Sequence, residues 1–276
     1  MRPDALLERI PVKNVLTIAG SDCSGGAGIQ ADLKTMCALG VYGMSAVTAV
    51  TVQNTQKVYA VQEMSPAIVA GQIDAVMDDI PVDAVKIGMM ANAGNIRVIH
   101  DRLLARRTAN IVLDPVMISK SGCSLLDREA EDELRRLIPA ADLVTPNMME
   151  AGALAGMKVT DRDAMREAAR AIAGLGAKNV LVKGGLLEGD ADDLLLLDGV
   201  EEWLRSPRVD TGNIQGTGCS LSSAIACHLA RGETLRAATE KAKAFVTRAL
   251  RDSLSIGRGV GPLGHMVQLY REAGRL

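Results

Sequence analysis

Short apolar runs that alternate with helical patterns constrain the fold of this chain more than any other feature. Helices are expected at 29–39, 66–79, 92–107, 127–137, 161–174, 217–230 and 234–250. Strands are predicted at 15–19, 44–52, 83–87, 111–113, 143–145, 180–182, 194–197 and 201–205. This alternation is typical of a mostly parallel sheet covered by helices on both faces. We therefore expect an α/β fold.

The 276 residues contain no repeat, low-complexity tract or linker, so we predict one domain over residues 1–276. The net charge is −2 and no dense Lys/Arg cluster occurs, which argues against a nucleic-acid surface. Aromatic residues make up only 2% of the chain, so a stacking platform for bases is also not expected.

Neither a membrane span nor a secreted protein is indicated. The longest uncharged window, 35–56, contains glycines and amides and is better explained by a helix end, a turn and a strand. The first 14 residues carry Asp4 and Glu8 and lack a long apolar stretch, unlike a signal peptide. Five cysteines, at 23, 37, 123, 219 and 227, form no CxxC pair, so neither zinc nor a disulfide framework is predicted. Free thiols suit the cytoplasm.

Polar and glycine-rich segments follow six of the predicted strands, after positions 19, 52, 87, 113, 145 and 182. In open α/β sheets, ligands bind beyond the carboxyl ends of the strands. Six such segments at one edge predict an active site there.

The first glycine cluster, Gly20 to Gly28, lacks the Gly-Lys-Ser/Thr of a phosphate-binding Walker loop. Its second half fits the loose GxGxxG/A dinucleotide pattern, but no acidic residue occurs between Asp32 and Glu63, where a ribose ligand is required. A dinucleotide site is therefore rejected. A tight strand-to-helix turn remains the plain alternative to a ligand-binding loop.

A second glycine cluster, Gly216-Thr217-Gly218-Cys219, precedes a clear helix. Small residues let the backbone approach an anion, and the first N–H groups and the helix dipole favour a phosphoryl group. The same helix start would stabilise a Cys219 thiolate, which could accept a proton from a substrate hydroxyl. A simple glycine-rich cap with a small buried cysteine explains the same residues.

Two further strand ends carry candidate phosphate and metal ligands. Asn147 and Glu150 offer oxygen ligands suited to Mg²⁺, although a capping box explains them better on sequence alone. Lys183 follows a buried strand and precedes two glycines, where it could reach a phosphate as a point charge. A surface lysine is the alternative.

Nine motifs occur together in one order: LTIAGSDCSGGAGIQADLKT, ALGVYG, TAVTVQNT, VKIGMM, VLDPVM, KSG, TPNMME, VKGG and GTGCSLSSAIA. Over nearly the whole chain, this pattern resembles the hydroxymethylpyrimidine/phosphomethylpyrimidine kinases. The resemblance implies a ribokinase-like fold, ATP and Mg²⁺. It implies two reactions of thiamin biosynthesis, in which 4-amino-5-hydroxymethyl-2-methylpyrimidine and then its monophosphate are phosphorylated. A homodimer is implied as well.

The resemblance also implies roles for individual residues. Cys219 is the candidate base, within an anion hole formed by Gly216, Thr217 and Gly218. ATP phosphates and Mg²⁺ are assigned to Lys183, Asp114, Asn147 and Glu150, with Thr217 also on the nucleotide. The pyrimidine is assigned to Gln53, Asp32, Gly20 and Met89. An amide such as Gln53 offers a donor and an acceptor to an aminopyrimidine, and methionine forms a flexible apolar wall.

Two positions depart from the family, which usually has histidine where this chain has Leu186 and Gln215. Both are expected to flank the nucleotide end of the site. A pyridoxal kinase of the same fold is the nearest alternative function. A non-catalytic pyrimidine-binding protein is less compatible with Asp114, Lys183 and Cys219 together, and related sugar kinases usually have aspartate at position 219.

Overall fold

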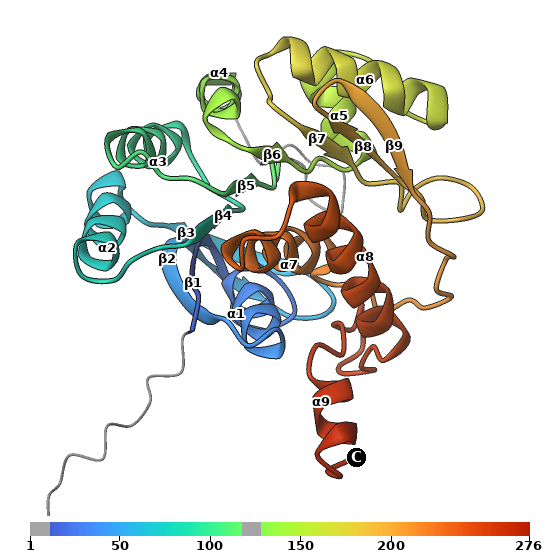
Figure 1. Ribbon diagram of the computed structural model, residues 1–276. Coiled ribbons are helices and arrows are strands. Elements are labelled where there is room, and N and C mark those ends of the chain that lie inside the picture. Colours follow the sequence, from blue (N-terminus) through green and yellow to red (C-terminus); the bar gives the residue numbers. More distant parts are fainter. Residues whose placement is uncertain (1–11, 118–127) are drawn as a thin grey trace, which may run out of the picture.

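The computed structural model describes residues 12–117 and 128–276, and these residues form a nine-stranded sheet. Its strand order is β3-β2-β1-β4-β5-β6-β7-β8-β9 (Figure 1). The strands are β1 (Asn14–Asp22), β2 (Tyr42–Gln53), β3 (Val58–Glu63), β4 (Ala84–Ile87), β5 (Ile111–Leu113), β6 (Leu143–Val144), β7 (Val180–Val182), β8 (Asp193–Leu197) and β9 (Val200–Leu204). The six strands from β2 to β7 in this order are parallel. Their carboxyl ends therefore share one edge, as predicted.

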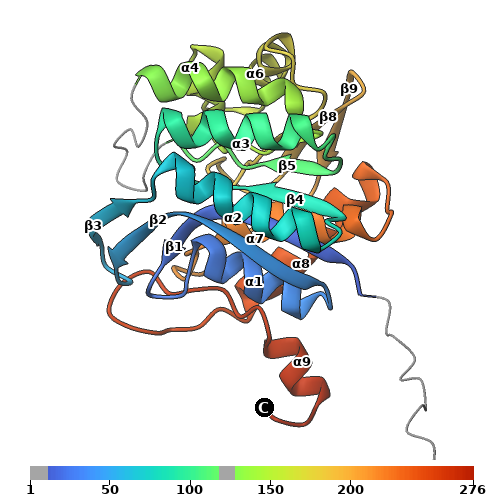
Figure 2. The ribbon, with the colours of Figure 1, turned by 90° about the vertical axis from the view of Figure 1, so that its left-hand side faces the viewer.

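Helices cover both faces of the sheet (Figures 1 and 2). One face packs against α1 (Gly28–Ala38), α7 (Thr217–Ala230) and α8 (Leu235–Arg251). The other packs against α2 (Pro66–Asp79), α3 (Ala93–Ala105), α4 (Arg128–Leu137), α5 (Met148–Ala155) and α6 (Arg162–Gly174). Side chains alternate along each strand, so Leu16 and Ile18 enter one core and Val15 the other. The predicted α/β class is confirmed.

Four elements are absent from the predicted ranges: β3, the short helix α9 (Val267–Glu272), the 3-10 turn Ile138–Ala140, and α5, of which only the capping signal at its start was recognised. Strand β3 pairs antiparallel with β2, and all six of its residues are exposed, so no buried apolar face marked it in the sequence. Helix α9 projects below the sheet in Figure 1. The predicted strands on either side of Asp198 and Gly199 do form β8 and β9, which are antiparallel. Both turn residues have positive φ, as such hairpin turns require.

Several predicted boundaries shift. Strand β1 continues past position 19 to Asp22, with an irregularity between Ala19 and Ser21, so Gly20 lies within the strand. The uncharged window 35–56 spans the end of α1, a turn and β2, as expected. Asp127, predicted to cap α4, lies outside the described residues, as do Cys123 and the KSG segment. None of the described helices is long and apolar enough to cross a bilayer.

Candidate active site

The first turn of α7 lies at the carboxyl edge of the sheet, and its conformation depends on glycine. Gly216 caps the helix with φ 81°, a left-handed conformation that favours glycine. A Cβ on Gly216 would also collide with the carbonyl oxygen of Gly26. Thr217 Oγ1 donates to the Ile214 carbonyl at 2.7 Å and Ser220 Oγ to the Gly216 carbonyl at 2.8 Å. The turn from Gly216 to Cys219, called the anion turn below, therefore has fixed N–H directions.

Cys219 lies on the anion turn and is partly exposed. Burial raises the pKa of Cys219 above its usual value. Lys86 and a hydrogen bond from the Gly28 N–H oppose this pKa rise, whereas Asp32 and Asp114 add to it. In the free protein, desolvation of the thiolate therefore opposes the stabilisation expected from the helix start.

Lys183 reaches the anion turn from the end of β7. Its Nζ donates to Asp114 Oδ1 at 2.6 Å and lies 3.9 Å from Glu150 Oε2. A Cβ on Gly218 would lie 3.2 Å from Lys183 Nζ and 3.5 Å from Asp114 Oδ2. Lys183 is thus not a surface lysine, and an ammonium and a carboxylate stand directly against the anion turn.

Asn147 and Glu150 form the capping box that the sequence favoured. Asn147 Oδ1 accepts the N–H groups of Met149 and Glu150 at 2.9 Å, and Glu150 Oε2 accepts the Asn147 N–H at 2.7 Å. Burial raises the pKa of Glu150 to about 7, with Lys183 opposing the rise and Asp114 adding to it. The amide of Asn147 is committed to the helix start, whereas the carboxylates of Asp114 and Glu150 both lie near Lys183.

Gln53 ends β2 on the opposite side of the site from Lys183. Its backbone is fixed by Cys23, whose Sγ donates to the Gln53 carbonyl at 3.1 Å and accepts the Gln53 N–H at 3.3 Å. Within the described residues, its half-buried side chain makes no hydrogen bond. The amide is therefore available to a ligand.

Met89 and Gly20 form an apolar contact beside the middle of β2, next to Thr48 and Ala49. Met89 follows β4, and its carbonyl accepts the Thr48 hydroxyl at 2.6 Å. A Cβ on Gly20 would collide with the Met89 side chain, so the methionine lies flat against the glycine backbone. The half-buried Met89 thus presents an apolar surface at the strand ends, as expected of a pocket wall.

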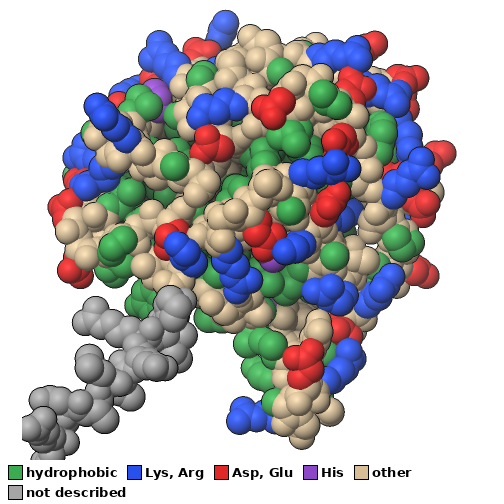
Figure 3. Space-filling view, in the orientation of Figure 1, with side chains coloured by type: hydrophobic (Ala, Val, Ile, Leu, Met, Phe, Trp, Pro, Cys, Tyr) green, Lys and Arg blue, Asp and Glu red, His purple; other side chains and the backbone are tan. Residues whose placement is uncertain are grey.

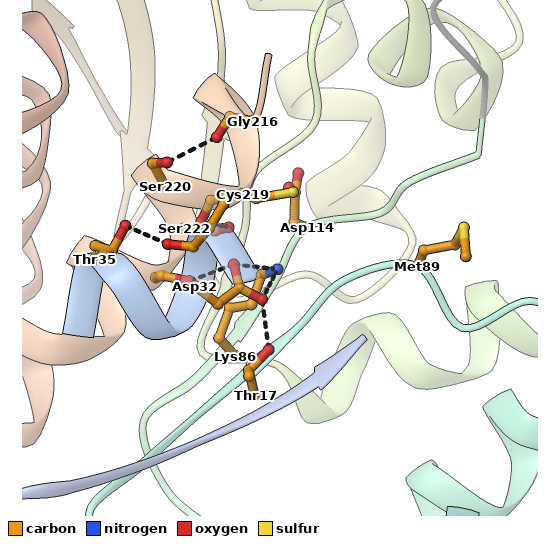
Figure 4. A network of polar contacts seen from close by, with 12 residues as sticks. Thr17, Asp32, Thr35, Lys86, Met89, Asp114, Gly216, Cys219, Ser220 and Ser222 are labelled. Atoms are coloured by element: carbon orange, nitrogen blue, oxygen red, sulfur yellow. Dashed lines mark hydrogen bonds and ion pairs between the residues drawn. The ribbon is translucent and has the colours of Figure 1, made fainter. Parts of the chain in front are cut away.

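Asp32 does not line the surface of the site. Its side chain has no exposed area and lies beneath Cys219, one layer below the surface of the site (Figure 4). The carboxylate therefore does not reach the surface where the resemblance implies a contact with the pyrimidine. Its carboxylate accepts Lys86 Nζ at 2.8 and 3.0 Å, Thr17 Oγ1 at 2.6 Å and Ser223 Oγ at 2.7 Å. These partners join β1, β4, α1 and α7 beneath Cys219.

Lys86 was missed by sequence reasoning, although a lysine within the apolar run of β4 was a usable signal. It has no exposed area and is one of the largest fully buried side chains. Isolated buried charges are very costly, so a lysine at such a position predicts a buried carboxylate partner.

Leu186 and Gln215 lie in different environments. Leu186 is exposed beyond β7, close to the expected nucleotide end. Gln215 is buried, and its Nε2 donates to Asp22 Oδ2 at 2.9 Å and to Ser24 Oγ at 3.3 Å. The side chain of Gln215 thus faces the loop between β1 and α1, and the backbone of Gln215 leads directly into the anion turn at Gly216.

A cavity of about 520 Å³ lies between β9 and α8. Lys243 in its wall donates to Asp193 Oδ2 at 2.7 Å, and Asp193 Oδ1 accepts the Gly184 N–H, next to Lys183. The cavity is thus linked to the lysine that faces the anion turn. It is lined by Trp203, Leu204, Arg205, Ser206, Glu240, Lys243, Ala244, Thr247, Arg248 and Arg251.

Known proteins share both the sequence pattern and the fold. The phosphomethylpyrimidine kinase family matches residues 22–264. A hydroxymethylpyrimidine/phosphomethylpyrimidine kinase of Streptomyces coelicolor is 47% identical, over 91% of this chain and 93% of its own. The thiamine biosynthesis bifunctional protein of Geobacter sulfurreducens is 50% identical over 93% of this chain, which spans only about half (53%) of that protein.

Solved structures agree with these relatives. A phosphomethylpyrimidine kinase from Clostridium difficile superimposes with a TM-score of 0.77 at 45% identity, covering 86% of this chain and 99% of that one. An ADP complex of Bacillus subtilis pyridoxal kinase gives a TM-score of 0.86 at 37% identity, covering 94% and 99%. The fold is therefore ribokinase-like, and the chain belongs to the phosphomethylpyrimidine kinase family.

Proposed function

We propose that this chain transfers phosphate from ATP to 4-amino-5-hydroxymethyl-2-methylpyrimidine and then to the resulting monophosphate, as a kinase of thiamin biosynthesis. The observation that carries the proposal is the anion turn at the start of α7, with Cys219 on it and Lys183 against Gly218. Phosphoryl transfer depends mainly on positioning and charge, and this arrangement supplies both. Steady-state ATP consumption with the pyrimidine tests it.

In this proposal, the N–H groups of the anion turn stabilise the transferring phosphoryl group and Lys183 neutralises the β/γ-phosphates. Cys219, as thiolate, accepts the proton of the substrate hydroxyl while the hydroxyl oxygen bonds to the γ-phosphorus of ATP, the bond from that phosphorus to the β,γ-bridging oxygen breaks, and ADP leaves. Asp114 and Glu150 fit Mg²⁺, because two nearly buried carboxylates lie beside a single lysine. Asn147 supports Glu150 through the capping box instead of ligating the ion directly. The ion would supply charge neutralisation for the phosphates.

The cavity between β9 and α8 is the proposed site of the nucleoside part of ATP. Its volume, about 520 Å³, is within the usual range for a small-molecule site. Trp203, Leu204 and Ala244 in its wall offer apolar surface to a base. The basic residues Arg205, Arg248 and Arg251 offer positive charge to an anionic ligand. The link through Lys243 and Asp193 to Gly184 would connect the base end to the phosphate end.

The raised pKa of Cys219 predicts a pH profile. A thiol that accepts a proton acts as thiolate, so kcat should rise with pH from neutral into the alkaline range, by up to about tenfold per unit. Glu150 also loses its proton near neutral pH, which adds to the rise. Cys219→Asp isolates the thiol, because an aspartate ordinarily loses its proton several pH units below a cysteine, so the rise should move to lower pH in this variant. A wild-type kcat that is flat above neutral pH would contradict the thiolate role.

Gln53 is proposed to select the aminopyrimidine through its free amide. Gln53→Met keeps the side-chain length but leaves the polar edge of the ring unpaired, at a cost of about 1–3 kcal/mol. The KM for the pyrimidine should therefore rise by roughly 5–150-fold, with the KM for ATP unchanged. A pyrimidine KM at the wild-type value would remove this role from Gln53.

A pyridoxal kinase is the second candidate, because the Bacillus subtilis pyridoxal kinase superimposes over nearly its full length. Turnover of the pyrimidine and of pyridoxal, measured side by side, separates the two. Ligand binding with no ATP consumption would instead favour a non-catalytic pyrimidine-binding protein.

We also propose that the enzyme is a cytoplasmic homodimer. All the described cysteines are free, which suits a reducing compartment. The β2–β3 hairpin exposes five large apolar residues that a second copy could cover: Val50, Val52, Val58, Tyr59 and Val61. On the face shown in Figure 3, by contrast, Lys and Arg are interspersed with Asp and Glu. Light scattering of wild type and Val52→Asp tests the dimer.

A further inference from the structure

Gln215 connects three segments that are far apart in the sequence. Its side chain donates to Asp22 and Ser24 of the first glycine loop, defined as residues 22–27. Its backbone N–H donates to the Gly261 carbonyl at 3.1 Å, in the segment 253–265, called the C-terminal strap. The next residue, Gly216, begins the anion turn. Gln215 therefore lies at the junction of all three.

The first glycine loop is wound around Asp22. Asp22 Oδ1 accepts the N–H and hydroxyl of Ser24, and Oδ2 accepts the N–H groups of Gly26 and Ala27 at 3.1 and 2.9 Å. The Gln215 amide completes this set on Oδ2. Glycine at position 26 is required, because a Cβ there would collide with the Gln215 side chain. The backbones of the first glycine loop and the anion turn are thus in direct contact, with no room between them for a larger side chain at position 26.

The C-terminal strap extends the junction to the candidate pyrimidine side. Val260 N–H donates to the Thr55 carbonyl at 2.9 Å and Gly259 N–H to Thr55 Oγ1 at 3.1 Å. Thr55 follows Gln53 by two residues. At its other end, His265 Nε2 lies 2.7 Å from Ser220 Oγ, on the first turns of α7. The strap therefore ties the segment after β2 to the first turns of α7.

One end of the Gln215 amide is left unsatisfied. The buried Oε1 has no hydrogen-bond partner among the described residues. An unpaired buried oxygen lowers stability, so an apolar side chain of similar size would serve packing better. We propose that Gln215 is a positioning residue, which fixes the first glycine loop and the anion turn at the relative distance that phosphoryl transfer needs. This inference rests on the proposed function.

The test compares Gln215→Met and Gln215→Glu with wild type. Gln215→Met keeps the length of the side chain and removes both donors to the loop. We expect kcat to fall by roughly 10–100-fold, as for a small misplacement of reacting groups, with a smaller change in KM and a folded protein by Tm. Gln72→Met is the matched control, since Gln72 bonds both backbone groups of Val47 outside the site. It should lower Tm and leave kcat unchanged.

Gln215→Glu adds a readout that a purely structural role would not move. At low pH the new carboxyl shares a proton with Asp22 and preserves the hydrogen bond, whereas at high pH the two carboxylates repel. The other ionisable groups around the junction are Lys34, whose Nζ bonds the Gly25 carbonyl, His265 on the strap and Cys219 on α7. They are common to both proteins. The ratio of variant to wild-type kcat should therefore fall from about pH 6 to about pH 9.

Three results would overturn the role of Gln215: a Gln215→Met kcat within about twofold of wild type, a kcat loss that matches the loss of folded protein, or a pH-independent Gln215→Glu ratio. If Gln215→Met does not fold, the Gln215→Glu ratio decides. Absence of pyrimidine phosphorylation by wild type would instead refute the proposed function, and the two failures are thereby distinguished.

Discussion

Cys219→Ala is expected to fold, to bind ATP and to lose kcat by about 10²–10⁴-fold, the usual range for a positioned acid or base. The backbone N–H groups of the anion turn survive this change, whereas the proton acceptor does not. The measurement is kcat, together with ATP binding by calorimetry and Tm. A wild-type kcat in Cys219→Ala would reduce Cys219 to a residue of the helix start.

Two further experiments sharpen this prediction. Cys219→Asp should recover part of the lost rate, because a carboxylate can accept the proton in the same place. Alkylation of Cys219 should inactivate the enzyme, and bound substrate should protect it. Cys23 and Cys37 are exposed, so the labelled peptide must be identified. Inactivation that follows labelling of either of these two alone would not support the assignment.

Lys183→Ala is expected to lower kcat by about 10²–10³-fold, comparable to the removal of one transition-state donor. The variant removes the ammonium that faces Gly218 and leaves Asp114 without its ion pair. Because Asp114 is almost completely buried, Tm should also fall. Kinetics and thermal unfolding of the same preparation separate the two effects.

Lys178→Ala is the matched control for this variant. Lys178 lies just before β7, at the edge of the sheet opposite Lys183, which lies just after β7. The Nζ of Lys178 forms an ion pair with Asp142 Oδ1 at 2.7 Å. We expect full activity and little change in Tm, since this pair is largely exposed. Full turnover by Lys183→Ala, or its failure to fold, would remove the phosphate assignment.

The sheet and most helices could be predicted because their signals are local. Buried strands such as β5 and β7 are short apolar runs, and Asn147 with Glu150 is a capping signal within four residues. Strand β3 escaped prediction because its exposed residues carry no pattern of burial. The local rules therefore recovered most elements that build the core. They gave only the start of α5, whose Met148, Ala151 and Leu154 are core residues, and they missed β3 and α9.

The environment of the site was less predictable, because it depends on partners that are far apart in sequence. Lys86 and Asp32 are 54 residues apart, and Gln215 and Asp22 are 193 apart. The pKa of Cys219 also depends on such partners and on burial, neither of which the local sequence around the helix start contains. The sequence motifs identified which side chains form the candidate site, whereas the charge states of these side chains depend on how they pack in the folded protein.

Product analysis tests the central claim most directly. Purified protein is incubated with Mg²⁺, ATP and 4-amino-5-hydroxymethyl-2-methylpyrimidine, and the products are followed by mass spectrometry, with Cys219→Ala in parallel. We predict that the monophosphate forms first and the pyrophosphate later, with ADP equal to the phosphate transferred, and that both products are strongly reduced in the variant. Wild-type protein that binds the pyrimidine but forms neither product would contradict the account.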